Sequence, residues 1–227
     1  MVAEQLKLVR ERIDRAATAA GRDPSEVVLV AVAKGRREDD VIAAYRAGHR
    51  DFGENRDHEL LAHAAAVPDD AHWHFIGTLQ RRKVGAVVAH AGLLHTLDRD
   101  SLIAAVGGRD NPPPVLIEVN LADEPQKHGY RVDEIAGAIT SAEQAGLDVR
   151  GLMAIPPMPE EPEDSRPWFE QLRSLRDDLW RGRAERGELS MGMTDDFEVA
   201  VSCGATLVRV GRAIFGDRTT APANAPR

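Results

Sequence analysis

Short apolar runs alternate with longer segments of helical period along most of the chain. Many of the runs are rich in β-branched residues, and the longer segments repeat apolar residues at three and four positions, as amphipathic helices do. The run at 27–33 is apolar throughout, which is typical of a parallel strand buried on both faces. Eight strands are predicted: Val27–Ala33, Asp51–Gly53, His74–Gly77, Leu93–Leu97, Val115–Asn120, Gly151–Ile155, Leu189–Met191 and Leu207–Val210.

This alternation predicts an α/β protein with a parallel sheet. Eight β/α units in 227 residues favour a single (β/α)8 TIM-type barrel. We expect one domain over 1–227, with an extra N-terminal helix at 3–20, the barrel at 25–218 and a C-terminal tail at 219–227. A doubly wound sheet gives the same alternation and remains the alternative, because only the count of eight favours the barrel.

Composition and charge narrow the classes of function. The net charge of −8, with basic residues scattered along the chain, disfavours nucleic acid as a partner. The longest apolar run has seven residues, whereas crossing a bilayer takes about 20. The first residues read as an amphipathic helix and not as a secretory signal, so we expect a cytoplasmic protein. The single cysteine, Cys203, excludes an intrachain disulfide and reads as a small buried hydrophobe.

Lys34 stands at the end of the first predicted strand, where barrel enzymes carry their chemistry. Seven apolar residues precede it, and apolar surroundings would lower the pKa of its ammonium group, as imine formation with a carbonyl requires. A lysine that ends a strand and extends into water is the more common case at such a position. Position alone leaves both interpretations open.

Two glycine-containing turns follow the last two predicted strands. Ser190–Thr194 and Val210–Arg212 both open into helical sequence, where barrels frequently bind phosphate through backbone N–H groups. The same glycines would also serve tight turns without any ligand. Together with Lys34, the two turns indicate a phosphorylated aldehyde as the ligand.

Arg209 lies inside the last predicted strand, on the same face as Leu207 and Gly211. If that face is the lumen, the guanidinium either forms a structural ion pair with Glu118 or Glu54, or faces the ring nitrogen of pyridoxal 5′-phosphate (PLP). In the second case a permanent cation keeps the nitrogen unprotonated and weakens the ring as an electron sink. The strand pattern leaves both open.

His72 and His74 place two imidazoles on one face of a strand, a spacing that metal-dependent barrel hydrolases also use. A metal site needs further ligands at other strand ends, and His74 begins its predicted strand instead of ending it. A metal-dependent hydrolase is therefore the remote alternative.

Six blocks of sequence are together typical of one family. They are Val30–Lys34, Asp51–Asn55, Trp73–Gly77 with Leu79 and Gln80, Gly151–Ile155, Ser190–Met193, and Val208–Gly211 with Ala213–Gly216. Over about residues 5–218 the chain resembles the YggS/PROSC family of pyridoxal phosphate homeostasis proteins, which is related in fold to the barrel domain of alanine racemase.

The resemblance assigns cofactor-binding roles to particular positions. The PLP lysine falls on Lys34, the active-site asparagine on Asn55, the ring-nitrogen arginine on Arg209, and the two phosphate loops on Ser190, Met191 and Gly192 and on Gly211 and Arg212. No catalytic residue and no metal ligand is assigned.

Four positions depart from the family pattern as we know it. The usual Thr, Tyr, His and Thr are replaced by Gly35, Arg56, Thr78 and Arg212. Only Arg212 touches the expected phosphate site, where its guanidinium or its backbone N–H would replace the lost hydroxyl. Lys127 lies in the place of a lysine that the family carries in a mobile loop, and we expect it to contact PLP transiently.

The resemblance implies a monomeric PLP carrier in vitamin B6 homeostasis, which holds PLP as a Schiff base on Lys34 and passes it to PLP-dependent apoenzymes. The alternative is a PLP-dependent amino-acid racemase of the alanine racemase type. Racemisation needs a second acid–base group, which alanine racemases take from a C-terminal β domain. This chain ends about ten residues after its last barrel segment, and neither Tyr45 nor Tyr130 follows a predicted strand end.

Overall fold

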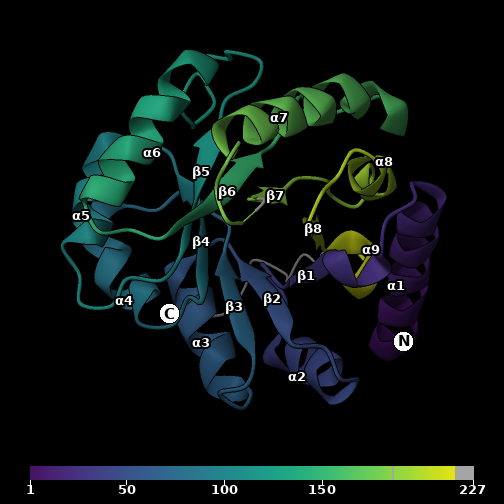
Figure 1. Cartoon of the computed structure of the whole chain (residues 1–227). Coiled ribbons are helices and arrows are strands. Elements are labelled where there is room, and N and C mark those ends of the chain that lie inside the picture. Colours follow the sequence, from purple (N-terminus) through teal and green to yellow (C-terminus); the bar gives the residue numbers. More distant parts are fainter. Residues whose placement is uncertain (186, 218–227) are drawn as a thin grey trace.

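The computed structural model describes residues 1–185 and 187–217, which fold into a closed barrel of eight parallel strands (Figure 1). Each strand pairs with the next, and β1 pairs with β8 to close the barrel. The predicted barrel is confirmed, and the doubly wound sheet is wrong. The strands are β1 (Val28–Val32), β2 (Asp51–Glu54), β3 (His72–Phe75), β4 (Leu93–Leu97), β5 (Val115–Val119), β6 (Val149–Ala154), β7 (Glu188–Ser190) and β8 (Leu207–Val210).

Helices surround the barrel (Figure 1). They are α1 (Val2–Ala19), α2 (Glu38–Arg46), α3 (Asp57–Ala66), α4 (Val84–Val88), α5 (Asp100–Gly107), α6 (Ile135–Gln144), α7 (Arg166–Leu179), α8 (Phe197–Ser202) and α9 (Arg212–Phe215). Short 3-10 turns lie at Pro24–Glu26, Arg81–Lys83, Val132–Glu134 and Pro162–Ser165. None of these helices is both long and apolar enough to cross a membrane.

The predicted N-terminal helix is α1, which begins and ends one residue earlier than expected. Its buried residues, Leu6, Val9, Ile13 and Ala17, recur at three and four positions and therefore form one stripe. This stripe faces the barrel, where α1 packs against α8 and α9. The expected tail at 219–227 lies outside the described residues.

One strand differs from its predicted bounds in a way that matters for the site. β3 begins at His72, two residues before the predicted start, because the backbone there pairs with Asp51 of β2. The pattern of apolar residues could not predict this strand start, because His72 and Asp51 are polar and the strand begins there through backbone pairing. His72 is therefore the first residue of β3 and His74 the third of its four residues, and neither lies in the loop after the strand, as Lys34 and Asn55 do for β1 and β2.

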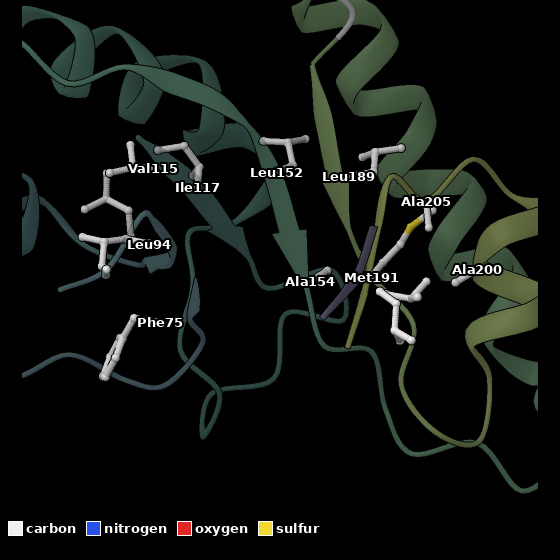
Figure 2. Packing of buried hydrophobic residues seen from close by; sticks show 14 of the residues in the cluster. Phe75, Leu94, Val115, Ile117, Leu152, Ala154, Leu189, Met191, Ala200 and Ala205 are labelled. Carbon is white, nitrogen blue, oxygen red and sulfur yellow. The ribbon is translucent and has the colours of Figure 1, made fainter. Parts of the chain in front are cut away.

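Strand alternation divides the core into two parts. The outward side chains pack against the helices and form the main hydrophobic core, of which Figure 2 shows several members, including Phe75, Leu152 and Met191. The inward side chains fill the lumen, and several of them are polar. A hydrogen bond from β4 to β7 demonstrates this, because these two strands are not neighbours in the barrel and can meet only across the lumen.

Candidate functional site

Lys34 lies in a turn directly after β1, and its side chain is exposed. The residue is therefore not enclosed by the apolar surroundings that the preceding run suggested. The apolar residues before it are buried within the strand, but the chain turns at Lys34 and carries the side chain to the rim of the barrel. The structure thus presents a primary amine at the carboxyl end of the first strand.

The turn that carries Lys34 is held from α3. Glu59 accepts a hydrogen bond of 3.1 Å from the backbone N–H of Gly35. His63, one turn later in α3, is hydrogen-bonded to Glu54, with 2.7 Å between Nδ1 and Oε1. Burial by itself would lower the pKa of His63, but its bond to Glu54 more than offsets this, so the pKa is raised.

Arg36 ties the same turn to the end of the barrel. Its guanidinium donates hydrogen bonds to the backbone carbonyls of Phe215, Gly216 and Asp217, and it lies 5.8 Å from the centre of the Phe215 ring. Phe215 is the last residue of α9, the helix that follows β8, and the other two residues come directly after it. The loop after β1 and the segment after β8 are therefore one connected unit.

Asn55 follows β2 and has a buried side-chain oxygen, Oδ1, without a hydrogen-bond partner among the described residues. The neighbouring loop after β3 lies close against it, since a Cβ added to Gly77 would stand 2.3 Å from the backbone oxygen of Asn55. Asn55 is thus fixed at the barrel rim with an acceptor that no group of the described chain uses.

The two predicted phosphate loops meet in the structure. The backbone N–H of Arg209 donates to the carbonyl of Gly192 over 3.0 Å, which joins the loop after β7 to β8. Gly192 has φ +87°, and a Cβ added there would lie 2.4 Å from the Cβ of Ala200 in α8. Only glycine fits this conformation and this close approach.

The side chains of these loops lie elsewhere than the sequence suggests. The hydroxyl of Ser190 lies in the lumen, and the side chain of Met191 belongs to the outer core (Figure 2). The guanidinium of Arg212 is exposed and donates to the carboxylate of Asp195. The backbone N–H of Met191 donates to the carbonyl of Leu207, so the backbone at Gly192 is what this loop can offer to a phosphate group.

Arg209 is buried in the lumen and remains a cation at neutral pH. It donates hydrogen bonds to the hydroxyl of Ser190 and, over 2.9 Å, to the carbonyl of Ala154. Burial lowers its pKa to about 10. The expected ion pair with Glu118 or Glu54 is wrong: in the described part of the chain neither carboxylate lies within 4.0 Å of this guanidinium, and Glu54 is bonded to His63.

Two buried polar residues of the lumen were given no place in the cofactor site by the sequence. Glu118 of β5 is only 8% exposed, and its Oε2 has no hydrogen-bond partner among the described residues. Burial, together with the nearby Asp98, raises its pKa to about 7. His95 of β4 is fully buried. The available signal was a polar residue within an otherwise apolar strand: Glu118 alone in β5, and His95 followed by Thr96 in β4.

Lys127 lies between the segments that follow β5 and β6. Its ammonium group forms an ion pair with Glu124 and lies 3.5 Å from the carbonyl of Ile155. The expected contact with PLP remains a prediction.

His72 and His74 both lie 3.3 Å from the same carboxylate oxygen of Asp51. Among the described residues, no group of three or more His, Cys, Asp or Glu side chains is arranged to hold a metal ion. The structure gives the metal-dependent hydrolase no support.

Comparison with known proteins agrees with this geometry. The sequence model of the alanine racemase N-terminal domain matches residues 5–219. The pyridoxal phosphate homeostasis protein of Aquifex aeolicus is 40% identical over 222 residues, which cover 95% of this chain and 97% of that protein. The protein of the same name from Escherichia coli K12 is 37% identical over 228 residues, covering 96% of this chain and 97% of that protein.

Solved structures agree with the sequence relatives. PipY of Synechococcus elongatus with PLP bound superimposes with a TM-score of 0.80 at 31% identity, covering 95% of this chain and 100% of that one. Alanine racemase from Corynebacterium glutamicum, at 16% identity and a TM-score of 0.69, covers 92% of this chain and 60% of that one and shares the fold alone. The resemblance seen in the sequence is confirmed: the chain belongs to the pyridoxal phosphate homeostasis protein family, whose barrel is that of the alanine racemase N-terminal domain.

Proposed function

We propose that this protein binds PLP as a Schiff base on Lys34 and serves as a PLP carrier in vitamin B6 homeostasis. One observation carries the proposal: the turn of Lys34 and the loop of Gly211 lie on the neighbouring strands β1 and β8. A Cβ added to Gly211 would stand 3.2 Å from the backbone oxygen of Val32, two residues before Lys34. An amine and a phosphate-binding loop side by side suit a phosphorylated aldehyde.

Particular groups of this chain would hold each part of the cofactor. Backbone N–H groups near Gly192 and at the start of α9, where helical partners are missing, would bind the phosphate. The unpartnered Oδ1 of Asn55 can accept a hydrogen bond from a hydroxyl on the ring. Arg209, a cation, would face the ring nitrogen and keep it unprotonated.

Two features favour a carrier over a racemase. PLP supplies an electron sink when its ring nitrogen is protonated, and a cation at Arg209 opposes that protonation. The tyrosines do not provide a second acid–base group: Tyr45 donates its hydroxyl proton to Asp70, Tyr130 to Asp100, and both have raised pKa values. The exposure of Lys34 also suits the transfer of PLP to another protein.

The test is reduction of the PLP-treated protein with borohydride, followed by location of the modified peptide by mass spectrometry. We expect a visible absorption band that reduction removes, and a pyridoxyl group on Lys34. Lys34→Ala should lose both, whereas Lys127→Ala should keep the adduct on Lys34. Equal labelling of surface lysines in the wild-type protein and in Lys34→Ala would refute the proposal.

The proposal includes a cytoplasmic monomer that passes PLP to apoenzymes. Light scattering of the purified protein measures its mass, and a dimer would contradict the monomer. Transfer is measured by the recovery of activity of a PLP-dependent apoenzyme mixed with the loaded protein. Recovery no faster than with an equal concentration of free PLP would contradict a carrier.

A further inference from the structure

A continuous series of hydrogen bonds crosses the barrel lumen from Arg209 to Asp51. Arg209 of β8 is bonded to the hydroxyl of Ser190, and this oxygen lies 2.8 Å from Nδ1 of His95. Nε2 of His95 lies 3.0 Å from Nδ1 of His74, and Nε2 of His74 lies 3.3 Å from a carboxylate oxygen of Asp51. We call Ser190, His95 and His74 the lumen relay.

One set of bond directions satisfies the whole lumen relay with neutral imidazoles. A guanidinium can only donate, so the Ser190 hydroxyl accepts from Arg209 and has its own proton left to give to Nδ1 of His95. In this arrangement His95 carries its proton on Nε2 and donates it to Nδ1 of His74. His74 in turn carries its proton on Nε2 and donates it to a carboxylate, which can only accept.

The burial of the relay agrees with this arrangement. His95 has no exposed surface, and burial, with His74 and Arg209 nearby, holds its pKa well below the usual 6.5. A neutral His95 has one donor and one acceptor, and the relay uses both. The arrangement leaves neither ring nitrogen of His95 or His74 without a partner.

The relay supplies one of two anchors of the Arg209 guanidinium. Nη1 is bonded to Ser190, and Nη2 is bonded to the backbone carbonyl of Ala154 in β6. Two bonds in different directions fix the plane of the guanidinium, whereas one bond would let it rotate. The bond to Ser190 depends on the side chains of the lumen relay. The bond to the backbone carbonyl of Ala154 does not depend on them.

We propose that His95 and His74 are positioning residues that act through Ser190 to hold Arg209 in the orientation that meets the ring of PLP. The contact between Arg209 and PLP rests on the proposed function, but the relay itself does not. The two claims can therefore be tested separately.

The first test uses the protein without PLP. Long-range 15N–1H NMR of the histidine rings distinguishes Nε2–H from Nδ1–H tautomers, and His74→Gln and His95→Gln assign the two signals among the eight histidines. From the hydrogen-bond partners we expect the proton on Nε2 and an accepting Nδ1 in both rings. A charged His95, or its Nδ1–H tautomer, would overturn the relay whether or not the protein binds PLP.

The second test measures whether the relay acts on the site. Ser190→Ala separates His95 from Arg209, and Ser190→Thr restores the hydroxyl. Thr206→Val is the matched control, because this hydroxyl accepts from the backbone N–H of Leu189 and lies outside the relay. The readouts are the Kd for PLP and the pH midpoint of the visible band, which reports on the ring.

We expect Ser190→Ala to weaken PLP binding about tenfold and to shift the pH midpoint, since a hydrogen bond to a charged group is lost. Ser190→Thr should restore much of both, and Thr206→Val should change neither. An unchanged midpoint and Kd in Ser190→Ala would overturn the positioning role. If the wild-type protein forms no band at all, the proposed function fails, and the tautomers still decide whether the relay exists.

Discussion

His63 of α3 and Glu54 of β2 form a buried hydrogen-bonded pair. Nδ1 of His63 lies 2.7 Å from Oε1 of Glu54, and the side chain of Glu54 has no exposed surface. One turn earlier in α3, Glu59 accepts a hydrogen bond from the backbone N–H of Gly35, the residue after Lys34. A buried charge pair thus supports the position of the amine, so its loss should affect both the stability and the site.

Replacement of His63 by Leu is expected to lower the free energy of unfolding by about 3–5 kcal/mol at mildly acidic pH, because it leaves a buried carboxyl group without its partner. Urea unfolding followed by circular dichroism measures the change. The double variant Glu54→Gln, His63→Leu should recover part of the loss, since no charge then remains to be paired. A double variant as unstable as the single one would contradict this explanation.

The contribution of His63 should also depend on pH. Its pKa is raised in the folded state above the ordinary 6.5. The stability that protonated His63 provides is therefore fully present below 6.5 and is lost as the pH rises through the folded value. The difference in unfolding free energy between the wild-type protein and the double variant Glu54→Gln, His63→Leu, in which neither group titrates, should shrink over that range, and a difference that grows with pH would contradict the raised pKa.

Gly192 should tolerate no side chain. Its φ of +87° and the 2.4 Å approach of an added Cβ to Ala200 predict that Gly192→Ala loses about 1–3 kcal/mol of stability and weakens PLP binding. Gly137 in α6 is the matched control, because an added Cβ meets no atom within 4 Å there. Gly137→Ala should stabilise the protein by about 0.5–1 kcal/mol. Thermal unfolding compares the two, and equal effects would contradict the close packing at Gly192.

Glu118→Gln should stabilise the protein above neutral pH and not at acidic pH. Burial, together with the nearby Asp98, raises the pKa of Glu118 from 4.5 to about 7. The stability tied to its proton is complete below 4.5 and is lost as the pH rises through about 7. The variant avoids that loss, which is on the order of 3 kcal/mol. Urea unfolding over a series of pH values measures it, and a constant difference at all pH values would contradict the assignment.

Cys203 should react with thiol reagents only when the protein unfolds. The side chain is 1% exposed, and burial raises the pKa of its thiol, so both access and thiolate formation are suppressed. With one cysteine in the chain, release of thionitrobenzoate from Ellman's reagent counts this thiol alone. We expect no fast reaction in the folded protein and one equivalent in denaturant. Fast labelling of the folded protein would show that Cys203 is accessible.

The order and number of the strands could be read from the amino-acid sequence. Alternation of apolar and polar residues is a property of neighbouring residues, so β1, β5 and β8 are visible without knowledge of any distant contact. The place of Lys34 at a strand end follows for the same reason. Gly192 and Gly211 also predicted the loops after β7 and β8 correctly, because the backbone conformation that favours glycine is a local property.

The amino-acid sequence could not predict where the side chains of the site point or which groups they contact, because both depend on the closure of the barrel. Ser190 and His95 are 95 residues apart in the chain and meet only because eight strands close into a ring. The same closure gives Arg209 a hydroxyl and a backbone carbonyl as partners where the sequence suggested a carboxylate. It also leaves Lys34 exposed at the rim. Strand pattern specifies which face a residue occupies, but the register and curvature of the closed sheet determine what lies opposite it.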